Sequence, residues 1–372
     1  MGGLHWYHAH MHGITRAQVA GGAFGLIVVE EQPRAQVFAS DSDSAALDGP
    51  WLLLTAPDRE RLLVAAYDPV AQRWGNAQSP NRTFALRRGQ WYRFRLLAQS
   101  VLGVASPLAL PPGCDCARLA NDGVYLFRVP QPLEEGGSVL LTGASRLDLA
   151  VRCNASSLFR MGADVVGVLA VDDEQRVEGR ASPYAGDGQQ QWDSFRPLYL
   201  ADLRSLPCDG CQEFSVRISP STVNGVSFDA FCPFKTADGG NWQFGQLNEW
   251  TLNNSGPHPF HLHLYHQQVV GSCGDGHASG EYFDTIAATG DGGAACVVRF
   301  VTRTHAARVM LHCHVLAHED AGAMGWIHVV PSEDTRYDTE PCCQLGRPCA
   351  TPCVAIPADD CNHTAMTMPF RV

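Results

Sequence analysis

The segment RVMLHCHVLAHED, residues 308–320, sets a cysteine between two histidines and follows it with a third histidine. Neighbouring side chains in an extended segment point to opposite faces, so Cys313 faces one way while His312 and His314 face the other. His318 comes five residues after the cysteine. If each face meets a metal ion, this tripeptide is a covalent path between two metal sites, one with a thiolate and one with imidazoles alone.

The thiolate face favours copper. One cysteine and two histidines in a trigonal site, with a weak axial ligand, form the blue-copper electron-transfer arrangement. Cys313 and His318 supply two of these ligands, so a second histidine must come from elsewhere in the chain. A zinc site uses the same residue types, but it does not need a cysteine flanked by histidines that point the other way. Zinc, or a buried structural cysteine, is therefore the weaker interpretation.

A second histidine cluster offers the missing ligand. In HPFHLH, residues 258–263, alternation puts His261 and His263 on one face, and His258 stands apart across a proline. Alone, this pattern could be a histidine-rich surface strand.

A third cluster lies at the start of the chain, in HWYHAHMHG, residues 5–13. His8 and His10 share a face of an extended segment. Without its context, this cluster would indicate only a generic metal-binding patch.

The three clusters together resemble the multicopper oxidases. WYHAHMHG, HPFHLHLY and HCHVLAHED look like three of that family's four copper-binding motifs, and the last two match in both spacing and residue type. The resemblance covers nearly the whole chain and implies tandem cupredoxin-like domains, each a Greek-key β-sandwich. The family's first motif, His-x-His-Gly, is expected well upstream, but only seven residues precede His8. The resemblance therefore implies a chain without most of the first domain, or a start assigned too late.

The resemblance also implies the ligands. It assigns His258, Cys313 and His318 to a type 1 (blue) copper. It assigns six histidines to a trinuclear site made of a type 2 copper and a type 3 pair: His261 at the type 2 ion, His8, His10 and His263 at the type 3 pair, and His312 and His314 at the end of the path from Cys313. Two further family ligands belong to the absent motif, so the type 2 copper should bind weakly. Up to about four copper ions are expected if that motif is supplied.

Other residues near these motifs leave alternatives. The family's axial position falls ten residues after the cysteine, at Ala323, with Met324 next. Either Met324 reaches the copper or the site lacks a strong axial ligand, and we expect the second. Glu319 resembles an acidic residue that relays protons toward the trinuclear cluster in several family members, although a solvated loop acid is the alternative. His5 and His12 are expected not to be ligands.

Short strand-like runs between turn residues predict an all-β chain. The expected parts are a C-terminal remnant of cupredoxin domain 1 at 1–32, a linker at 33–50, cupredoxin domain 2 at 51–175, a linker at 176–195, cupredoxin domain 3 at 196–332 and a Cys-rich tail at 333–372. Domain 2 contains no histidine, so it cannot hold a histidine-ligated copper. Domain 3 is expected to hold the blue copper and half of the trinuclear site.

Composition excludes some partners. The net charge is −11 without long like-charge runs, which argues against nucleic acid or an anionic membrane surface. No window approaches the ~18 apolar residues of a membrane span, and no signal peptide follows Met1. The expected partners are O₂ and a small reducing substrate.

Cysteines and sequons favour an oxidising compartment. The chain has 14 cysteines, and setting Cys313 aside leaves an odd number, so at least one more is free or pairs outside the chain. The pair Cys208 and Cys211 is expected to form a structural disulfide rather than a redox pair. Four Asn-x-Ser/Thr sequons begin at Asn81, Asn154, Asn253 and Asn362. A secreted glycoprotein is the prediction.

The resemblance implies a laccase-like oxidase. Such an enzyme removes single electrons from phenols or similar donors at the type 1 copper and reduces O₂ to water at the trinuclear cluster. A metal-ion oxidase of the ferroxidase kind is the alternative within the class. If the first domain is absent, the chain could instead be a copper-binding electron-transfer protein only.

Overall fold

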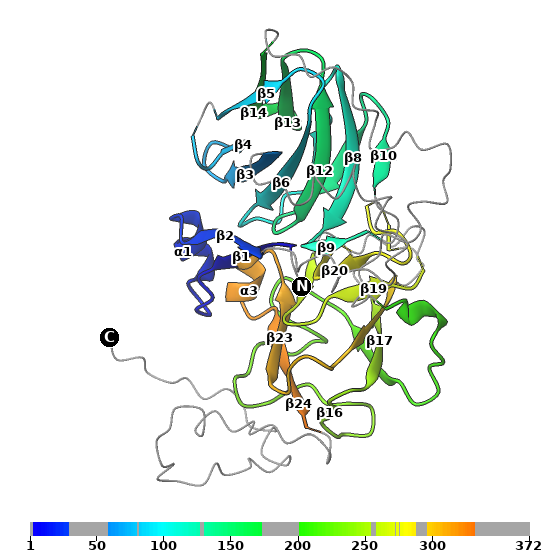
Figure 1. The fold of residues 1–372 in the computed structure, drawn as a ribbon. Coiled ribbons are helices and arrows are strands. Elements are labelled where there is room, and N and C mark those ends of the chain that lie inside the picture. Colours follow the sequence, from blue (N-terminus) through cyan, green and yellow to red (C-terminus); the bar gives the residue numbers. More distant parts are fainter. Residues whose placement is uncertain are drawn as a thin grey trace, which may run out of the picture.

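The computed structural model describes residues 3–29, 59–79, 82–126, 130–172, 201–253, 258–271, 273–274, 276–287 and 296–331. Two β-sandwiches lie one above the other, and a short N-terminal segment lies at their junction (Figure 1). The predicted all-β class and tandem sandwiches are confirmed. The predicted linkers and the Cys-rich tail lie outside the described residues, so the domain boundaries stay predictions.

Two sheets form the first sandwich. One has the strand order β10-β8-β12-β6-β3-β4, with β9 beside β8, and the other has the order β11-β7-β13-β14-β5. The strands are β3 (Glu60–Asp68), β4 (Arg73–Asn76), β5 (Thr83–Arg87), β6 (Trp91–Gln99), β7 (Ser106–Ala109), β8 (Cys114–Asn121), β9 (Val124–Tyr125), β10 (Gln131–Leu133), β11 (Ser138–Leu141), β12 (Arg146–Cys153), β13 (Ser157–Met161) and β14 (Asp164–Asp172). Alternate β6 residues Tyr92, Phe94 and Leu96 enter one core, as a strand period of two requires.

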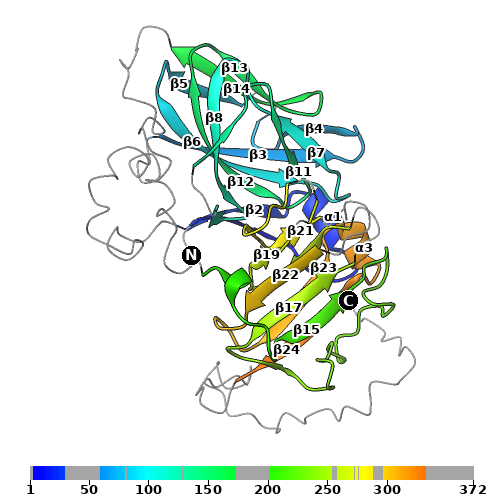
Figure 2. The same cartoon turned by 90° about the vertical axis from the view of Figure 1, so that its right-hand side faces the viewer.

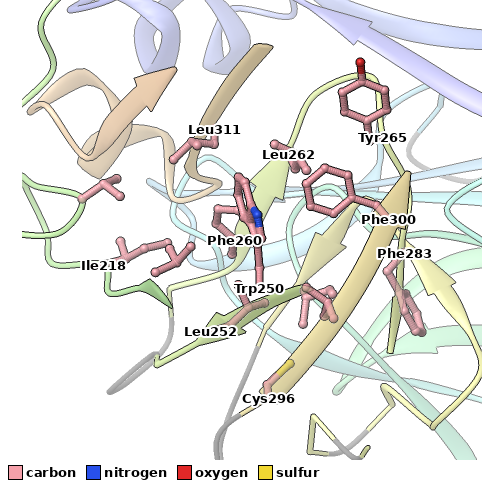
Figure 3. Packing of buried hydrophobic residues seen from close by; sticks show 14 of the residues in the cluster. Ile218, Trp250, Leu252, Phe260, Leu262, Tyr265, Phe283, Cys296, Phe300 and Leu311 are labelled. Atoms are coloured by element: carbon pink, nitrogen blue, oxygen red, sulfur yellow. The ribbon is translucent and has the colours of Figure 1, made fainter. Parts of the chain in front are cut away.

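The second sandwich has the sheet orders β15-β17-β22-β19-β20 and β16-β24-β23-β18-β21. Its elements are η5 (Leu203–Ser205), β15 (Gln212–Val216), β16 (Trp242–Gln243), β17 (Leu247–Leu252), β18 (Phe260–Leu262), β19 (Gln267–Val269), β20 (Tyr282–Phe283), β21 (Thr285–Ile286), β22 (Cys296–Val301), β23 (Arg308–Cys313), α3 (Leu316–Asp320) and β24 (Met324–Val330). Trp250, Phe260 and Phe300 pack at the centre of its core (Figure 3), with ring centroids 6.2 and 5.0 Å from Trp250. This core holds β18 and β23, which carry His261, His312 and Cys313.

The N-terminal segment docks on the second sandwich. Its strands β1 (Gly3–His8) and β2 (Phe24–Val29) pair antiparallel, and helix α1 (Thr15–Ala20) lies between them in sequence. The carboxylate of Asp320 caps α1 from α3, because it accepts the backbone N–H groups of Thr15 at 2.9 Å and Arg16 at 2.8 Å. Figure 2 also shows α1 beside α3. This cap fixes the start of the chain next to residues 308–320.

Disulfides are confirmed in the described part of the chain. They join Cys114 to Cys153, Cys208 to Cys211 and Cys273 to Cys296. Among the described cysteines, Cys116 and Cys313 are free and buried. The second pair forms the disulfide that the sequence indicated. Within the described ranges, no helix combines the length and apolar character that crossing a membrane requires.

Candidate metal centres

Strand β23 separates the two faces as its alternation predicts. The residues Val309, Leu311 and Cys313 contribute to the core of the second sandwich, whereas His312 lies on the opposite face. The antiparallel partner β18 has Phe260 opposite Cys313 and His261 opposite His312. Residues paired across strands share a face, so His261 and His312 point the same way.

On the core face, Cys313 meets two histidines. Its Sγ lies 3.6 Å from Nδ1 of His258 and 3.6 Å from Nδ1 of His318, and the two Nδ1 atoms are 3.1 Å apart. Burial lowers the pKa of both imidazoles, which keeps them neutral and able to bind a metal. Burial raises the pKa of the Cys313 thiol to about 12, so a metal cation would be needed to hold the thiolate at neutral pH.

This donor set fits copper by its chemistry. A soft thiolate and two imidazole nitrogens converge without a carboxylate among them. All three donor atoms lie within 4.8 Å of one another, and two of the residues, His258 and Cys313, are buried. The zinc alternative is weaker. His312 and His314, the neighbours of Cys313, do not join its donor set but lie together on the opposite face.

The strand register argues against Met324 as the axial ligand. Met324 pairs with His312, so its thioether points to the histidine face and away from Cys313. The residue across from Cys313 is Ala323, whose carbonyl accepts the Cys313 N–H at 3.0 Å. A one-residue shift would move Met324 to the other face, but the register of β24 excludes it. The register therefore disfavours Met324, and a site without a strong axial ligand stays the prediction.

On the opposite face, six histidines gather from three chain segments. Nε2 of His312 lies 3.2 Å from Nε2 of His10 and 3.2 Å from Nε2 of His263. The ring of His314 lies 5.5 Å from that of His8 and 5.3 Å from that of His261. The structure therefore brings together all the histidines that the sequence predicted for this site: His8, His10, His261, His263, His312 and His314.

Backbone carbonyls fix the tautomers of three of these rings. Nδ1 of His8 lies 2.8 Å from the Ala9 carbonyl, Nδ1 of His261 lies 2.8 Å from the Asp284 carbonyl, and Nδ1 of His312 lies 3.0 Å from the Cys313 carbonyl. A carbonyl oxygen only accepts, so each Nδ1 must carry the proton and each Nε2 offers a lone pair. These imidazoles are therefore oriented as metal ligands through Nε2.

Burial also keeps these imidazoles neutral. Desolvation lowers the pKa of His8 to about 4, of His261 to about 4 and of His263 to about 2. It lowers the pKa of His312 and His314 well below the usual value. Because these imidazoles stay unprotonated, their free nitrogen lone pairs can bind a metal cation.

Glu319 lies against this histidine set rather than in solvent. Its side chain is fully buried, with Oε1 3.3 Å from Nδ1 of His10 and Oε2 3.4 Å from Nδ1 of His312. Burial raises the pKa of Glu319 to about 8, and the neighbouring charge of Asp320 adds to this. Burial therefore favours the protonated carboxyl, beside the site where O₂ reduction would need protons.

The remaining histidines near the clusters have other neighbours. The ring of His5 lies 6.3 Å from that of His266, and exposed His12 lies 4.8 Å from Phe228. Neither His5 nor His12 joins a three-donor group among the described residues.

Sequence reasoning missed a set of charged residues behind His261. Burial acts to raise the pKa of Asp284, but Arg146, His261 and His266 outweigh it, so the carboxyl is charged. Burial raises the pKa of Asp122 to about 7. No motif spacing marks these residues, because Arg146 and Asp122 come from the first sandwich.

Comparisons with known proteins agree with this geometry. The family model for multicopper oxidase matches residues 221–333, which contain both of the specific histidine motifs. A laccase from Pycnoporus cinnabarinus is 25% identical over 394 residues, covering 90% of this chain and 71% of the laccase.

Solved structures show the same fold. A multi-copper oxidase from Pseudomonas thermotolerans has a TM-score of 0.64 at 22% identity, covering 88% of this chain and 76% of that one. A multicopper oxidase from Campylobacter jejuni described as a metallo-oxidase has a TM-score of 0.62 at 15% identity, covering 89% and 72%. The sandwiches are therefore cupredoxin domains in tandem. Residues 221–333, which contain both specific histidine motifs, belong to the multicopper oxidase family, and the described part of the chain shares the fold of solved multicopper oxidases.

Proposed function

We propose that this chain is a laccase-like oxidase, which takes single electrons from a small organic donor and delivers them to O₂. The observation that carries the proposal is the adjacency of the two donor sets at His312 and Cys313 on β23. Copper bound in these sets would supply the one-electron redox chemistry and the oxygen reduction. The chain's own residues hold the donors, exclude water and offer a proton.

The roles proposed for the ligands follow the two faces. His258, Cys313 and His318 would form the type 1 site, through Nδ1, Sγ and Nδ1. The opposite set would form the oxygen site, with His261 at the type 2 position and the others at the type 3 pair: His8, His10, His263, His312 and His314. The short backbone from Cys313 to His312 would couple the two sites.

The surroundings of His318 support an organic donor over a metal ion. A metal-ion substrate would need free carboxylates near this histidine, since hard cations prefer oxygen ligands. Glu319 is fully buried against the other face, and both oxygens of Asp320 accept backbone N–H groups of α1. Glu319 is therefore buried, and the half-buried Asp320 is engaged in capping α1.

Exposed apolar side chains lie on a loop that packs against this part of the chain. The loop before β16 packs on the turn that follows His318, because the Phe228 N–H donates to the Gly322 carbonyl at 3.0 Å. On this loop Val226 and Phe231 are 51% and 56% exposed, although exposed side chains of this kind usually prefer burial. Such a surface suits the ring of a phenol.

Donor specificity tests the proposal. We expect the copper-loaded chain to oxidise a methoxyphenol with a kcat/KM at least about 10-fold above that for ferrous ion. This ratio corresponds to a difference in activation free energy of about 1.4 kcal/mol or more. Asp320→Asn should leave the ratio of the two kcat/KM values unchanged, because this carboxylate accepts backbone N–H groups at the start of α1. Preferred ferrous oxidation that Asp320→Asn abolishes would instead make the chain a metal-ion oxidase.

Glu319→Gln should slow turnover. A positioned acid contributes about 10²–10⁴-fold, so we expect a loss of about 10²-fold or more at neutral pH. With its pKa at about 8, the Glu319 carboxyl holds a transferable proton below that pH and loses it above. The rate of the unmodified chain should therefore fall as the pH rises past the pKa of this carboxyl in the copper-loaded protein, and the variant should lack this limb.

Steady-state turnover across pH measures this effect. Glu249→Gln is the matched control, because Glu249 pairs with Arg299 on β17 and β22 and contacts neither histidine set. Unchanged turnover with an unchanged pH profile in Glu319→Gln would remove the proton-relay role.

A further inference from the structure

A buried arginine of the histidine-free sandwich reaches the oxygen site. Arg146, the first residue of β12, is 3% exposed, and its guanidinium bonds the carboxylate of Asp284 in the second sandwich. It also donates to the Ala144 carbonyl at 2.6 Å and lies 3.5 Å from Oδ1 of Asp122. A buried charge is costly unless it is fully paired, and the fork geometry of arginine serves all three partners at once.

From Asp284 a chain of hydrogen bonds leads to His261. The hydroxyl of Thr285 donates to Oδ1 of Asp284 at 2.9 Å. Because this hydroxyl donates its hydrogen to the carboxylate, its oxygen can accept a hydrogen bond from Nδ1 of His261, 3.1 Å away. The Asp284 carbonyl accepts from the same Nδ1 at 2.8 Å. Both partners of Nδ1 therefore require the proton to stay there.

Asp122 holds the same peptide from the other side. Its Oδ2 lies 3.3 Å from the N–H of Asp284 and 3.3 Å from the N–H of Thr285, and its Oδ1 accepts the Arg146 N–H at 3.0 Å. Asp122 adopts φ +47°, in the turn between β8 and β9. Gly123 follows with φ +79°, and an Asp-Gly pair with positive φ angles is favoured in such a hairpin turn. Residues 284–285 are thus clamped by the first sandwich at both the backbone and the side chain.

We propose that Arg146 and Asp122 are positioning residues for His261, which fix its ring and its Nδ1–H tautomer so that Nε2 faces the oxygen site. The histidine-free sandwich then has a direct part in building that site. The consequence for copper binding rests on the proposed function, whereas the tautomer and the ring orientation do not.

The first readout needs no copper. In the copper-free chain with ¹⁵N-labelled histidine, NMR should find His261 almost wholly in the Nδ1–H form. In Arg146→Gln, the Nε2–H form should become a major species. Thr285→Val keeps the ion pair and nearly the same shape while removing one of the two acceptors of Nδ1. Because the Asp284 carbonyl remains, this variant should raise the Nε2–H fraction less than Arg146→Gln does, and it provides the test if Arg146→Gln folds poorly.

The second readout is copper binding. Both variants should lose about 10–100-fold in affinity for the copper that His261 binds, as outer-shell changes typically do, with the blue absorption unchanged. Arg93→Gln is the matched control, because Arg93 forms a buried pair with Asp148 in the same sheet, with Nε 3.0 Å from Oδ2. This control should keep the His261 tautomer and the type 2 electron paramagnetic resonance signal.

Each outcome decides. An unchanged tautomer in Thr285→Val and Arg146→Gln overturns the proposal. The proposal is also overturned if the variants lose copper at both sites and their melting temperature falls in parallel, because that result would indicate a merely structural role. If the tautomer shifts as expected but the unmodified chain binds no copper at His261, the positioning role stands and the proposed oxidase function fails.

Discussion

Replacing Cys313 by serine is expected to abolish the blue colour and the oxidase activity together. The blue absorption of such a site belongs to the copper–thiolate bond, and a serine hydroxyl is a hard, protonated donor at neutral pH. Sγ is the point at which His258 and His318 converge, 3.6 Å from each. Outer-shell changes at metal sites typically cost 10–100-fold, so loss of the thiolate itself should cost more than about 100-fold in turnover.

Cys116→Ser provides the matched control. Cys116 is the other free, buried cysteine among the described residues, and it lies in the core of the first sandwich. This variant should stay blue and active, with at most a modest loss of stability. Absorption spectra and oxygen uptake on the same samples measure both effects. A blue Cys313→Ser protein would overturn the assignment of the thiolate site.

His312→Gln should separate the two sites. Nε2 of His312 is the shared neighbour of His10 and His263, at 3.2 Å from each, and the side chain is fully buried. The change removes this donor without touching the thiolate, which faces the other way. We expect the protein to stay blue and to be bleached once by a reducing donor, with oxygen uptake reduced by more than about 100-fold.

His328→Gln serves as the control for this experiment. His328 lies on β24 beside Trp326, with a ring separation of 6.3 Å, and belongs to neither three-donor group. Its oxygen uptake should match that of the unmodified chain. If His312→Gln consumed oxygen at the normal rate, or lost its blue colour as Cys313→Ser does, the two-face account would be wrong.

Local alternation made the core of the site predictable from sequence. The opposite faces of Cys313 and His312 follow from a strand period of two, and the same rule groups His261 with His263. The predicted all-β class followed in the same way from short strand-like runs between turns. These features depend on residues a few positions apart, which a sequence displays directly.

Features that depend on register or on distant contacts were not predictable. Met324 is one residue from the family's axial position, and only the pairing of β23 with β24 reveals that it faces His312. Whether Glu319 is buried or solvated depends on how α1 docks, which the Asp320 cap decides. Arg146 reaches His261 through Asp284, from another sandwich, so no local pattern could mark it.

Copper content measured together with blue absorption, on the unmodified chain after anaerobic loading, tests the central claim most directly. Two donor sets on opposite faces of β23 predict a blue protein with about two or more copper ions per chain, of which one, at Cys313, gives the colour. A colourless protein, or one whose only copper lies at the histidine set, would contradict the account.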